Sequence, residues 1–519
     1  MGSKRVTWVA AVLGTVAVAG IMGCRKGAAT GKGSTAVNAS ELSASGSTTK
    51  KWVPSLSGLA VGATGTLWAA GKIYSPFDFG AGTVASSGGA DIYLTKLDPA
   101  TSLATATFTF GDSGGKDQIA TAVAIASSGN VSVIGYFSGE IDFTASTADG
   151  SGPSGKPGTA GLDFLQAGSA VPFFGVFDKA STGRYVTPIK VHMVDVGFGA
   201  LLSVNANPGQ NAFAICGKTS RAVADWSDSG ANRGVITGDK AVAGGDMDIV
   251  VAKIDAATGA VLWGKQFGGA GNQVCESVTI DNNGDVIVAG GYSGTLKFGG
   301  ATSALPVQAD TSLALLYVAR LDGTSGAPIA ARTWGTAGRS NAYSVTVDAS
   351  SNIIVAGVLG GDIDFGGGIS ITNAGWTDAF VVKLTSTLAP VWAKSFGDAD
   401  FDQTARSVGV TSIGDVFIGG SFKGNLGTLG LTSTNQTTVD AFTAKLAASD
   451  GAVLDAHAYG DAAGAQAVSS IAVARTATGA LANSVFIGGS FSSSITLMGT
   501  TLSTGSPSAW ASFVARLIQ

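Results

Sequence analysis

The residues best suited to chemistry in this 519-residue chain are three carboxylates that alternate within one short segment. Asp398, Asp400 and Asp402 offer the oxygen ligands that Ca²⁺ prefers. An EF-hand loop also requires Gly at its sixth position and Glu at its twelfth, where this chain has Gln403 and Gly409. We therefore predict a solvated acidic turn, with Ca²⁺ binding as the alternative, and we predict no other metal site.

A second group of candidates combines tryptophan with charge. Residues 218–245 carry Trp226 between Arg221 and Arg233, and Trp376 precedes a later β-like run. An exposed indole can stack on a sugar or anchor a protein. These residues are therefore candidates for binding, and the alternative is that each indole folds back and packs against the scaffold.

Four glutamines recur at one place in the repeat that is described below. A single site does not need a copy in several repeats, so repetition favours a structural role. We predict that these side chains bond the backbone of the connecting links, with a polar ligand at a channel mouth as the alternative. The four are Gln118, Gln273, Gln403 and Gln466.

Sequence signatures of catalysis are missing. The two histidines, His192 and His457, have no metal-ligand spacing, and neither a Gly-x-Ser-x-Gly elbow nor a phosphate loop is present. Charged residues make up 13% of the chain, the net charge is −4, and no basic block occurs, which excludes nucleic acid as a partner. We predict no cofactor and no catalysis.

The elements that would position these candidates follow from a repeat of about 60 to 80 residues. Each copy contains four short runs rich in Val, Ile and Phe, separated by turn residues. Runs such as Val286–Val288 are apolar on both sides of the pleat, so both faces of the sheet must be covered. We predict an all-β fold, a seven-bladed β-propeller of four-stranded blades. Its most regular strands end at Gly71, Gly135, Gly217, Gly290, Gly357, Gly419 and Gly488.

The ends of the repeat region predict how the ring closes. The seventh copy stops after its third run, Ser512–Ile518, and residues 49–54 place Trp52 as Trp263 and Trp392 are placed in fourth runs. We therefore predict that residues 49–54 complete the last blade and close the ring. The predicted blades are 55–112, 113–197, 198–269, 270–336, 337–397, 398–460 and 461–519.

Two insertions, 144–170 and 218–245, separate second and third strands. Links alternate between faces in an antiparallel blade, so both insertions and Trp376 should share a face with the links between blades. Long loops on one face of a rigid scaffold are where binding concentrates. Cys216 and Cys275 fall in adjacent blades, where either a disulfide or two buried thiols are consistent with the sequence.

The N-terminus has the pattern of an export signal. Two cations precede the apolar stretch Val6–Ile21, as in secretory signals. The segment Ile21–Cys24 resembles the lipobox of bacterial lipoproteins, which implies a signal peptide at 1–23, lipid on Cys24 and, because Asp does not follow the cysteine, the outer membrane. Residues 24–48 are rich in Gly, Ala, Ser and Thr, and we predict a disordered tether ahead of the propeller at 49–519.

Three recurring segments, Ile280–Gly290, Asp364–Gly367 and Asp378–Leu384, resemble bacterial β-propeller repeat proteins of the SBBP type. The resemblance implies the fold and an extracytoplasmic location, and it implies no activity. One segment, Ala252–Trp263, looks like the tryptophan-docking repeat of quinoprotein propellers, although a single copy is also explained by turn chemistry.

The sequence therefore predicts a lipid-anchored, monomeric binding protein of the cell envelope. Its partners would be an envelope protein or a polysaccharide, held on the face that carries the insertions, and it would meet the membrane only through its lipid. One alternative is a polysaccharide lyase or glycosidase with carboxylates around the axis. The other is an assembly scaffold of the outer membrane that faces the periplasm.

Deleting residues 49–54 should lower the melting temperature of the whole propeller, because the last blade would lose its outer strand and the ring its closure. A deletion of equal length near the start of the tether serves as the control. Unchanged melting of the 49–54 deletion, followed by circular dichroism, would contradict this closure.

Overall fold

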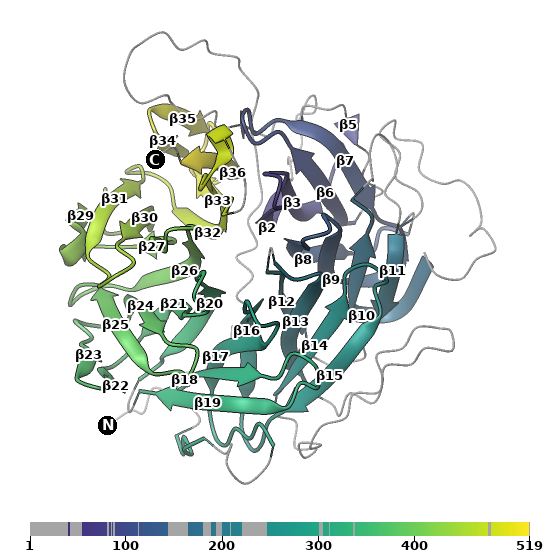
Figure 1. The fold of residues 1–519 in the computed structure, drawn as a ribbon. Coiled ribbons are helices and arrows are strands. Elements are labelled where there is room, and N and C mark those ends of the chain that lie inside the picture. The colour runs from purple at the N-terminus through teal and green to yellow at the C-terminus, as the bar shows by residue number, and fades with distance from the viewer. Residues whose placement is uncertain are drawn as a thin grey trace, which may run out of the picture.

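The computed structural model describes Ser40–Glu41 and residues 54–517, with gaps of which the longest are 144–163, 180–187, 194–199 and 221–246. Within these residues the strands form seven four-stranded antiparallel sheets and four two-stranded ones. The sheets surround a common axis as the blades of a seven-bladed β-propeller (Figure 1). The predicted fold class is therefore confirmed.

Each of the first six blades is a meander whose strand order follows the chain. The strands of the first three are β2 (Ser55–Val61), β3 (Leu67–Ile73), β6 (Asp91–Leu97) and β7 (Ala104–Phe110); β8 (Gln118–Ile125), β9 (Val131–Asp142), β10 (Phe164–Phe177) and β11 (Pro188–Met193); and β12 (Ala200–Asn205), β13 (Ala212–Thr219), β14 (Asp248–Asp255) and β15 (Val261–Phe267).

The next three blades repeat this plan. Their strands are β16 (Gln273–Ile280), β17 (Val286–Tyr292), β18 (Leu315–Leu321) and β19 (Pro328–Trp334); β20 (Asn341–Val347), β21 (Ile353–Leu359), β24 (Asp378–Leu384) and β25 (Pro390–Phe396); and β26 (Gln403–Val410), β27 (Val416–Phe422), β30 (Asp440–Leu446) and β31 (Val453–Tyr459).

The seventh blade is assembled from both ends of the chain. It contains β32 (Gln466–Val473), β33 (Val485–Ser492) and β36 (Trp510–Leu517), and its fourth place is taken by β1 (Ser40–Glu41), where Ser40 pairs with Val514. This short strand falls in the segment assigned above to the tether. Residues 49–53 lie outside the described part of the chain, so closure by residues 49–54 stays a prediction.

Short secondary-structure elements lie in the links between second and third strands. They are the hairpins β4 (Phe77–Asp78) with β5 (Thr83–Val84), β22 (Ile363–Gly366) with β23 (Ile369–Ile371), β28 (Asn425–Leu426) with β29 (Leu431–Thr432), and β34 (Ser494–Leu497) with β35 (Thr500–Ser503), and the 3₁₀ turn η1 (Gly427–Leu429). A second 3₁₀ turn, η2 (Gly479–Leu481), joins β32 to β33. No helix among the described residues is long and apolar enough to cross a membrane.

The core lies between the blades. In β17, Val286 and Val288 pack in the apolar cluster shared with the third blade, whereas Ile287 and Ala289 pack in the cluster shared with the fifth. Alternate side chains of a strand point to opposite faces, so one continuous apolar run fills both interfaces. This arrangement explains why the second strands are apolar without alternation.

The first strand of each blade lies nearest to the axis, and these seven strands contact one another in order, β2 with β8 and onward to β32, which contacts β2. Every one of them contains a β-bulge, where one residue has no partner on the second strand. Opposite each bulge stands a glycine; a Cβ on Gly290, for example, would overlap the carbonyl oxygen of Val274. The repeated glycines therefore permit the bulges.

In two blades the glycine opposite the bulge differs from the glycine named from the sequence as the end of the most regular strand. The residues opposite the bulge in the sixth and seventh blades are Gly420 and Gly489, which pair with Ala405 and Val468. Each lies one position after the glycine chosen by aligning the repeats. Both blades contain two consecutive glycines, so the sequence alone could not decide between them.

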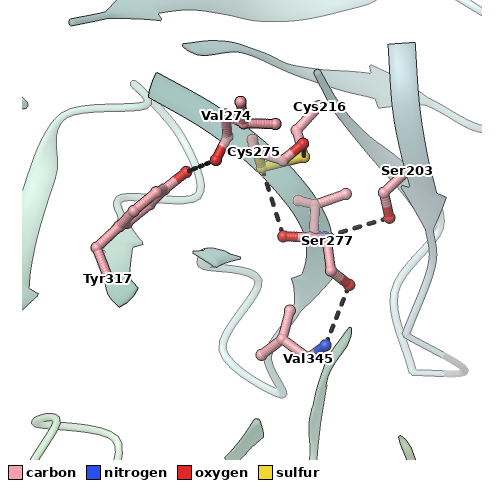
Figure 2. Close-up of a disulfide and its surroundings, with 8 residues drawn as sticks. Ser203, Cys216, Val274, Cys275, Ser277, Tyr317 and Val345 are labelled. Atoms are coloured by element: carbon pink, nitrogen blue, oxygen red, sulfur yellow. Dashed lines mark hydrogen bonds between the residues drawn. A yellow bond between two sulfur atoms is a disulfide. The ribbon is translucent and has the colours of Figure 1, made fainter. Parts of the chain in front are cut away.

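A serine directly after the bulge joins neighbouring blades. Ser277 Oγ accepts a hydrogen bond from the backbone N–H of Val345 in the fifth blade (3.1 Å), while Val278 N–H donates to Ser203 Oγ in the third (3.2 Å) (Figure 2). The same bond continues around the ring to the first blade. Its further donors and acceptors are Val408 with Ser344, Ile471 with Ser407, and Leu59 with Ser470.

Replacing Ser277 or Ser344 with alanine should each cost about 1–3 kcal/mol of unfolding free energy, because a buried N–H of the next blade loses its acceptor. Ser350→Ala, at an exposed turn position, is the matched control. Urea unfolding followed by tryptophan fluorescence measures the difference. Equal stability of all three variants would show that the serine bonds do not hold the blades together.

Candidate functional site

The unpaired residue of each bulge lies at the axis and is partly or fully exposed, whereas the residue before it is buried in every blade except the first. In three consecutive blades this position carries a large polar or charged side chain, whereas the other blades carry small or aliphatic ones. The seven residues, in chain order, are Ser57, Thr121, Leu202, Glu276, Tyr343, Arg406 and Ser469. All seven blades contain the bulge, but the large polar and charged side chains at the bulge lie in three consecutive blades, on one side of the axis.

Glu276, Asn341, Tyr343 and Arg406, which we call the axial cluster, contact one another across three blades. Asn341 Nδ2 on β20 donates to Glu276 Oε1 on β16 at 3.3 Å. The Arg406 guanidinium on β26 lies over the Tyr343 ring, 4.3 Å from its centre, which is a cation–π contact. The four side chains thus form one polar surface.

Burial disfavours charge in this cluster. It raises the pKa of the Glu276 carboxyl, and the Asn341 amide, Lys218 and Arg406 only partly oppose that rise. Burial also raises the pKa of the Tyr343 phenol, although the charge of Arg406 acts in the other direction. Tyr343 is therefore a neutral hydrogen-bonding group at physiological pH.

Two groups of the cluster lack hydrogen-bond partners within the described chain. The Arg406 guanidinium is partly buried and touches the Tyr343 ring, but no protein acceptor meets its N–H groups. Asn341 Oδ1 is buried and receives no hydrogen bond. The guanidinium, which is only partly buried and meets no acceptor among the described residues, is suited to a ligand that supplies one, whereas the buried Oδ1 is out of a ligand's reach.

The backbone on either side of Glu276 is fixed from three directions (Figure 2). A disulfide joins Cys275 to Cys216 of the third blade, with the two Cα atoms 5.9 Å apart. Burial keeps the Tyr317 phenol protonated by raising its pKa, and that phenol donates to the Val274 carbonyl at 3.0 Å. With Ser277 bonded to the fifth blade, the bulge that presents Glu276 is preorganised.

The four repeated glutamines brace the links. All four side chains are fully buried, and each donates from Nε2 to link carbonyls; Gln273, for instance, reaches Ala270, Ser293 and Thr295 at 3.0–3.2 Å. This geometry corresponds to the backbone-bonding interpretation of Gln118, Gln273, Gln403 and Gln466, and leaves none of them accessible to a ligand.

Trp376 is exposed over 70% of its surface and lies on the face of the links between blades. The next residue, Thr377, accepts a hydrogen bond from the Gln403 N–H at the start of β26, and Arg406 follows three residues along that strand. Trp376 and the axial cluster therefore open toward the same face. The other binding candidates, Arg221, Trp226 and Arg233, and the lipidation candidate Cys24 lie outside the described residues.

Of the three alternating carboxylates, Asp398 caps the turn that contains the other two. Asp398 accepts hydrogen bonds from the backbone of Asn425, Asp400 and Phe401, which outweigh burial and lower its pKa. Asp402 accepts one from the Thr377 hydroxyl at 2.6 Å. Across the described chain no three His, Cys, Asp or Glu side chains are grouped to hold a metal.

The sequence analysis did not identify the axial cluster. A β-bulge does not interrupt the run of β-forming residues by which a strand is recognised, so the sequence does not show where it lies. One signal was available: the three members at bulge positions each precede a serine that recurs in the repeat, as in Glu276–Ser277, Tyr343–Ser344 and Arg406–Ser407. The scaffold residue is constant and its neighbour varies. A variable residue next to a recurring serine therefore indicates a position where the backbone is fixed and the side chain can differ between blades.

Comparison with known proteins gives distant likenesses only. No family model and no curated protein match the chain. Similar solved structures include the Dos1 propeller (10% identity, TM-score 0.33, covering 71% of this chain and 75% of that one) and a protein of unknown function from Dyadobacter fermentans (9%, 0.36, 76% and 93%). Another is quinohemoprotein alcohol dehydrogenase from Comamonas testosteroni (10%, 0.35, 83% and 66%). The chain is a seven-bladed β-propeller that these comparisons assign to no family.

Glu276→Gln should raise the melting temperature relative to the native protein, and the difference should grow as the pH rises from 4 to 8. A carboxyl whose folded pKa is raised contributes full stability below its ordinary pKa and loses it as the pH passes the folded value, whereas glutamine does not titrate. Melting curves of both proteins, with Ser57→Ala as a pH-independent control, measure this. A difference that shrinks with rising pH would contradict the raised pKa.

Proposed function

We propose that this protein is an exported, lipid-anchored binding protein that recognises a polysaccharide of the cell envelope at the axial cluster, without catalysis. The observation that carries the proposal is the Arg406 guanidinium at one side of the axis: it is only partly buried and meets no acceptor among the described residues, and Glu276 and Tyr343 lie beside it. The lipid anchor is supported by the sequence around Cys24 alone.

A carbohydrate ligand suits this surface better than a protein does. Sugar hydroxyls both donate and accept, which matches a carboxyl, an amide, a phenol and a guanidinium placed side by side. Trp376 adds an exposed indole on the same face, where a polymer leaving the axis could stack. The fully buried centre of a protein–protein interface is usually apolar and poor in charged residues, whereas the axial cluster contains a carboxyl and a guanidinium.

Recognition also suits the cluster better than hydrolysis does. Most glycosidases place two carboxylates on either side of the bond that is broken. Of the seven bulge residues at the axis only Glu276 is acidic. Binding through one carboxyl and several neutral or cationic groups needs no second acid.

One observation favours a second candidate, a polysaccharide lyase. Elimination requires a base that removes the proton beside a uronate carboxylate, while a cation holds that carboxylate, and Tyr343 stacked against Arg406 could take these two roles. The proton would pass to the phenolate, the C–O bond to the leaving sugar would break as a C=C double bond forms, and the leaving oxygen would take a proton from water. The raised pKa of Tyr343 opposes formation of the phenolate, so we rank this function second.

The test is binding to a panel of neutral and acidic envelope polysaccharides by isothermal titration calorimetry, with the full chain. The variant Glu276→Gln, Tyr343→Phe, Arg406→Gln should weaken binding at least tenfold, because each lost charged hydrogen bond contributes about 1.5–3 kcal/mol. Ser57→Ala with Ser469→Ala changes the same bulge position in two other blades and should bind like the native protein.

Equal affinity of the native protein and the triple variant would rule out the axial cluster as the site. Unsaturated sugar ends in the titration product, detected by their ultraviolet absorbance, would replace recognition with the lyase function. Capture of one envelope protein by crosslinking in intact cells, with no polysaccharide bound, would replace it with a protein-binding or assembly role.

A further inference from the structure

We infer that a cavity between the first and second blades is a second binding site, which takes a small dianion such as a phosphate monoester or a dicarboxylate. The cavity lies on the face opposite the links between blades, where first strands turn into second strands and third strands into fourth. The inference does not depend on the proposed function. It follows from one lysine that lacks the acceptors found at the same position in other blades.

The lysine occupies a position that repeats around the ring. The sixth or seventh residue of the third strand is a cation in every blade except the second, and these residues are Lys96, Lys253, Arg320, Lys383, Lys445 and Arg516. Long cationic side chains at such a position need acceptors where they are partly buried. Five of the six have one within the described chain.

Those five acceptors come from turns on the same face. They are Asp281 and Asp285 for Arg320 (3.3 and 2.7 Å), Asp348 for Lys383 (3.0 Å), Asp415 for Lys445 (3.2 Å), Ser484 Oγ for Arg516 (3.0 Å), and the carbonyl oxygens of Gly284 and Gly323 for Lys253 (2.7 and 2.9 Å). The fold therefore normally supplies this cation with a carboxylate or another oxygen.

Lys96 in the first blade is the exception. Its side chain is partly buried, and no acceptor among the described residues meets its ammonium group. The residue directly after the first strand and the one directly before the second, which are aspartates in the fourth blade, are Gly62 and Thr66 here. The Thr66 hydroxyl is bonded to the Thr64 hydroxyl at 2.9 Å. The first blade thus contains the cation without either carboxylate.

A cavity of about 240 Å³ lies at this position, and Lys96 is part of its wall. The second blade contributes Lys179, whose side chain packs over Gly129, and the hydroxyl-bearing Ser127 and Ser128. No acceptor among the described residues meets the Lys179 ammonium group either. The lining residues include no Asp or Glu. Two cations without a counter-charge therefore line one cavity.

The inner wall of the cavity is rigid. Trp68 lines it and is only 2% exposed, because its ring stacks on Phe108 with the ring centres 6.1 Å apart. Trp68 also pairs with Lys96 across the second and third strands, so the backbone that presents the lysine belongs to the sheet. A cavity built in this way exists before a ligand enters it.

Charge and size together define the ligand. A neutral molecule would leave both ammonium groups without a counter-charge, and a monoanion would leave one. A dianion supplies both charges, and its oxygens also accept from the Ser127 and Ser128 hydroxyls. The cavity is smaller than the pockets that hold drug-sized ligands, which restricts it to a compact molecule or to the charged end of a larger one.

Isothermal titration calorimetry with the full chain tests the inference at fixed ionic strength, so that general screening is equal for all ligands. The probes are glycerol 3-phosphate, succinate and, as the monoanion, acetate. At least one of the two dianions should bind saturably and at least tenfold more tightly than acetate. Lys96→Gln and Lys179→Gln should each weaken that binding roughly 10- to 100-fold, as expected for the loss of a charged hydrogen bond.

Lys445→Gln is the matched control, because it removes one positive charge from the same strand position in the sixth blade. It should bind the dianion like the native protein. Without ligand it should melt at a lower temperature, since Asp415 loses its partner. Lys96→Gln breaks no such pair and should melt like the native protein, which also confirms that this variant is folded.

Three results would overturn the inference. They are an absence of saturable binding for both dianions, an affinity for acetate equal to that for the dianions, and an equal loss of binding in Lys96→Gln and Lys445→Gln, which would indicate a response to overall charge. None of them bears on the axial cluster, because polysaccharide binding is measured separately and on the opposite face.

Discussion

The hydrogen bond from a backbone N–H to the serine of the preceding blade is the interaction on which the propeller depends. A strand at the axis pairs on one side only, and its bulge leaves N–H groups that its own sheet cannot satisfy. The Val278 N–H donates to Ser203 Oγ and the Val345 N–H donates to Ser277 Oγ. An N–H group that its own sheet leaves unpaired therefore forms the hydrogen bond to the neighbouring blade. The glycine opposite each bulge, such as Gly290, is required for the same arrangement, because a Cβ there would collide with the bulged backbone.

This arrangement separates scaffold from chemistry. The serine and the glycine hold the backbone, so the bulged residue between them is free to differ from blade to blade. Where the serine is missing, in the first two blades, Gly58 and Ala122 take its place, and Thr121 donates instead to the Leu201 carbonyl at 3.0 Å. The ring can therefore lose the bond locally and keep its geometry. That tolerance allows one side of the axis to carry a glutamate, a tyrosine and an arginine.

The fold could be predicted from the sequence because the repeat imposes it. Runs such as Val286–Val288 are apolar on both sides, and this pattern fits only sheets covered on both faces. The site could not be predicted the same way. A bulge shifts register by one residue without changing composition, so the residue that it turns toward the axis leaves no mark in the strand pattern. The pairing of Cys216 with Cys275 required the geometry of two neighbouring blades, although their positions in adjacent repeats were visible.

The energetics of the axial cluster support a functional origin. A carboxyl that burial drives toward protonation costs stability, and an apolar side chain would pack there at lower cost. The surroundings offset that cost with rigid supports: the disulfide at Cys275 and the Tyr317 hydroxyl on Val274 fix the same strand. Other bulge positions hold serine, threonine or leucine and need none of these supports. These supports fix the strand that presents Glu276, in keeping with the binding function proposed above.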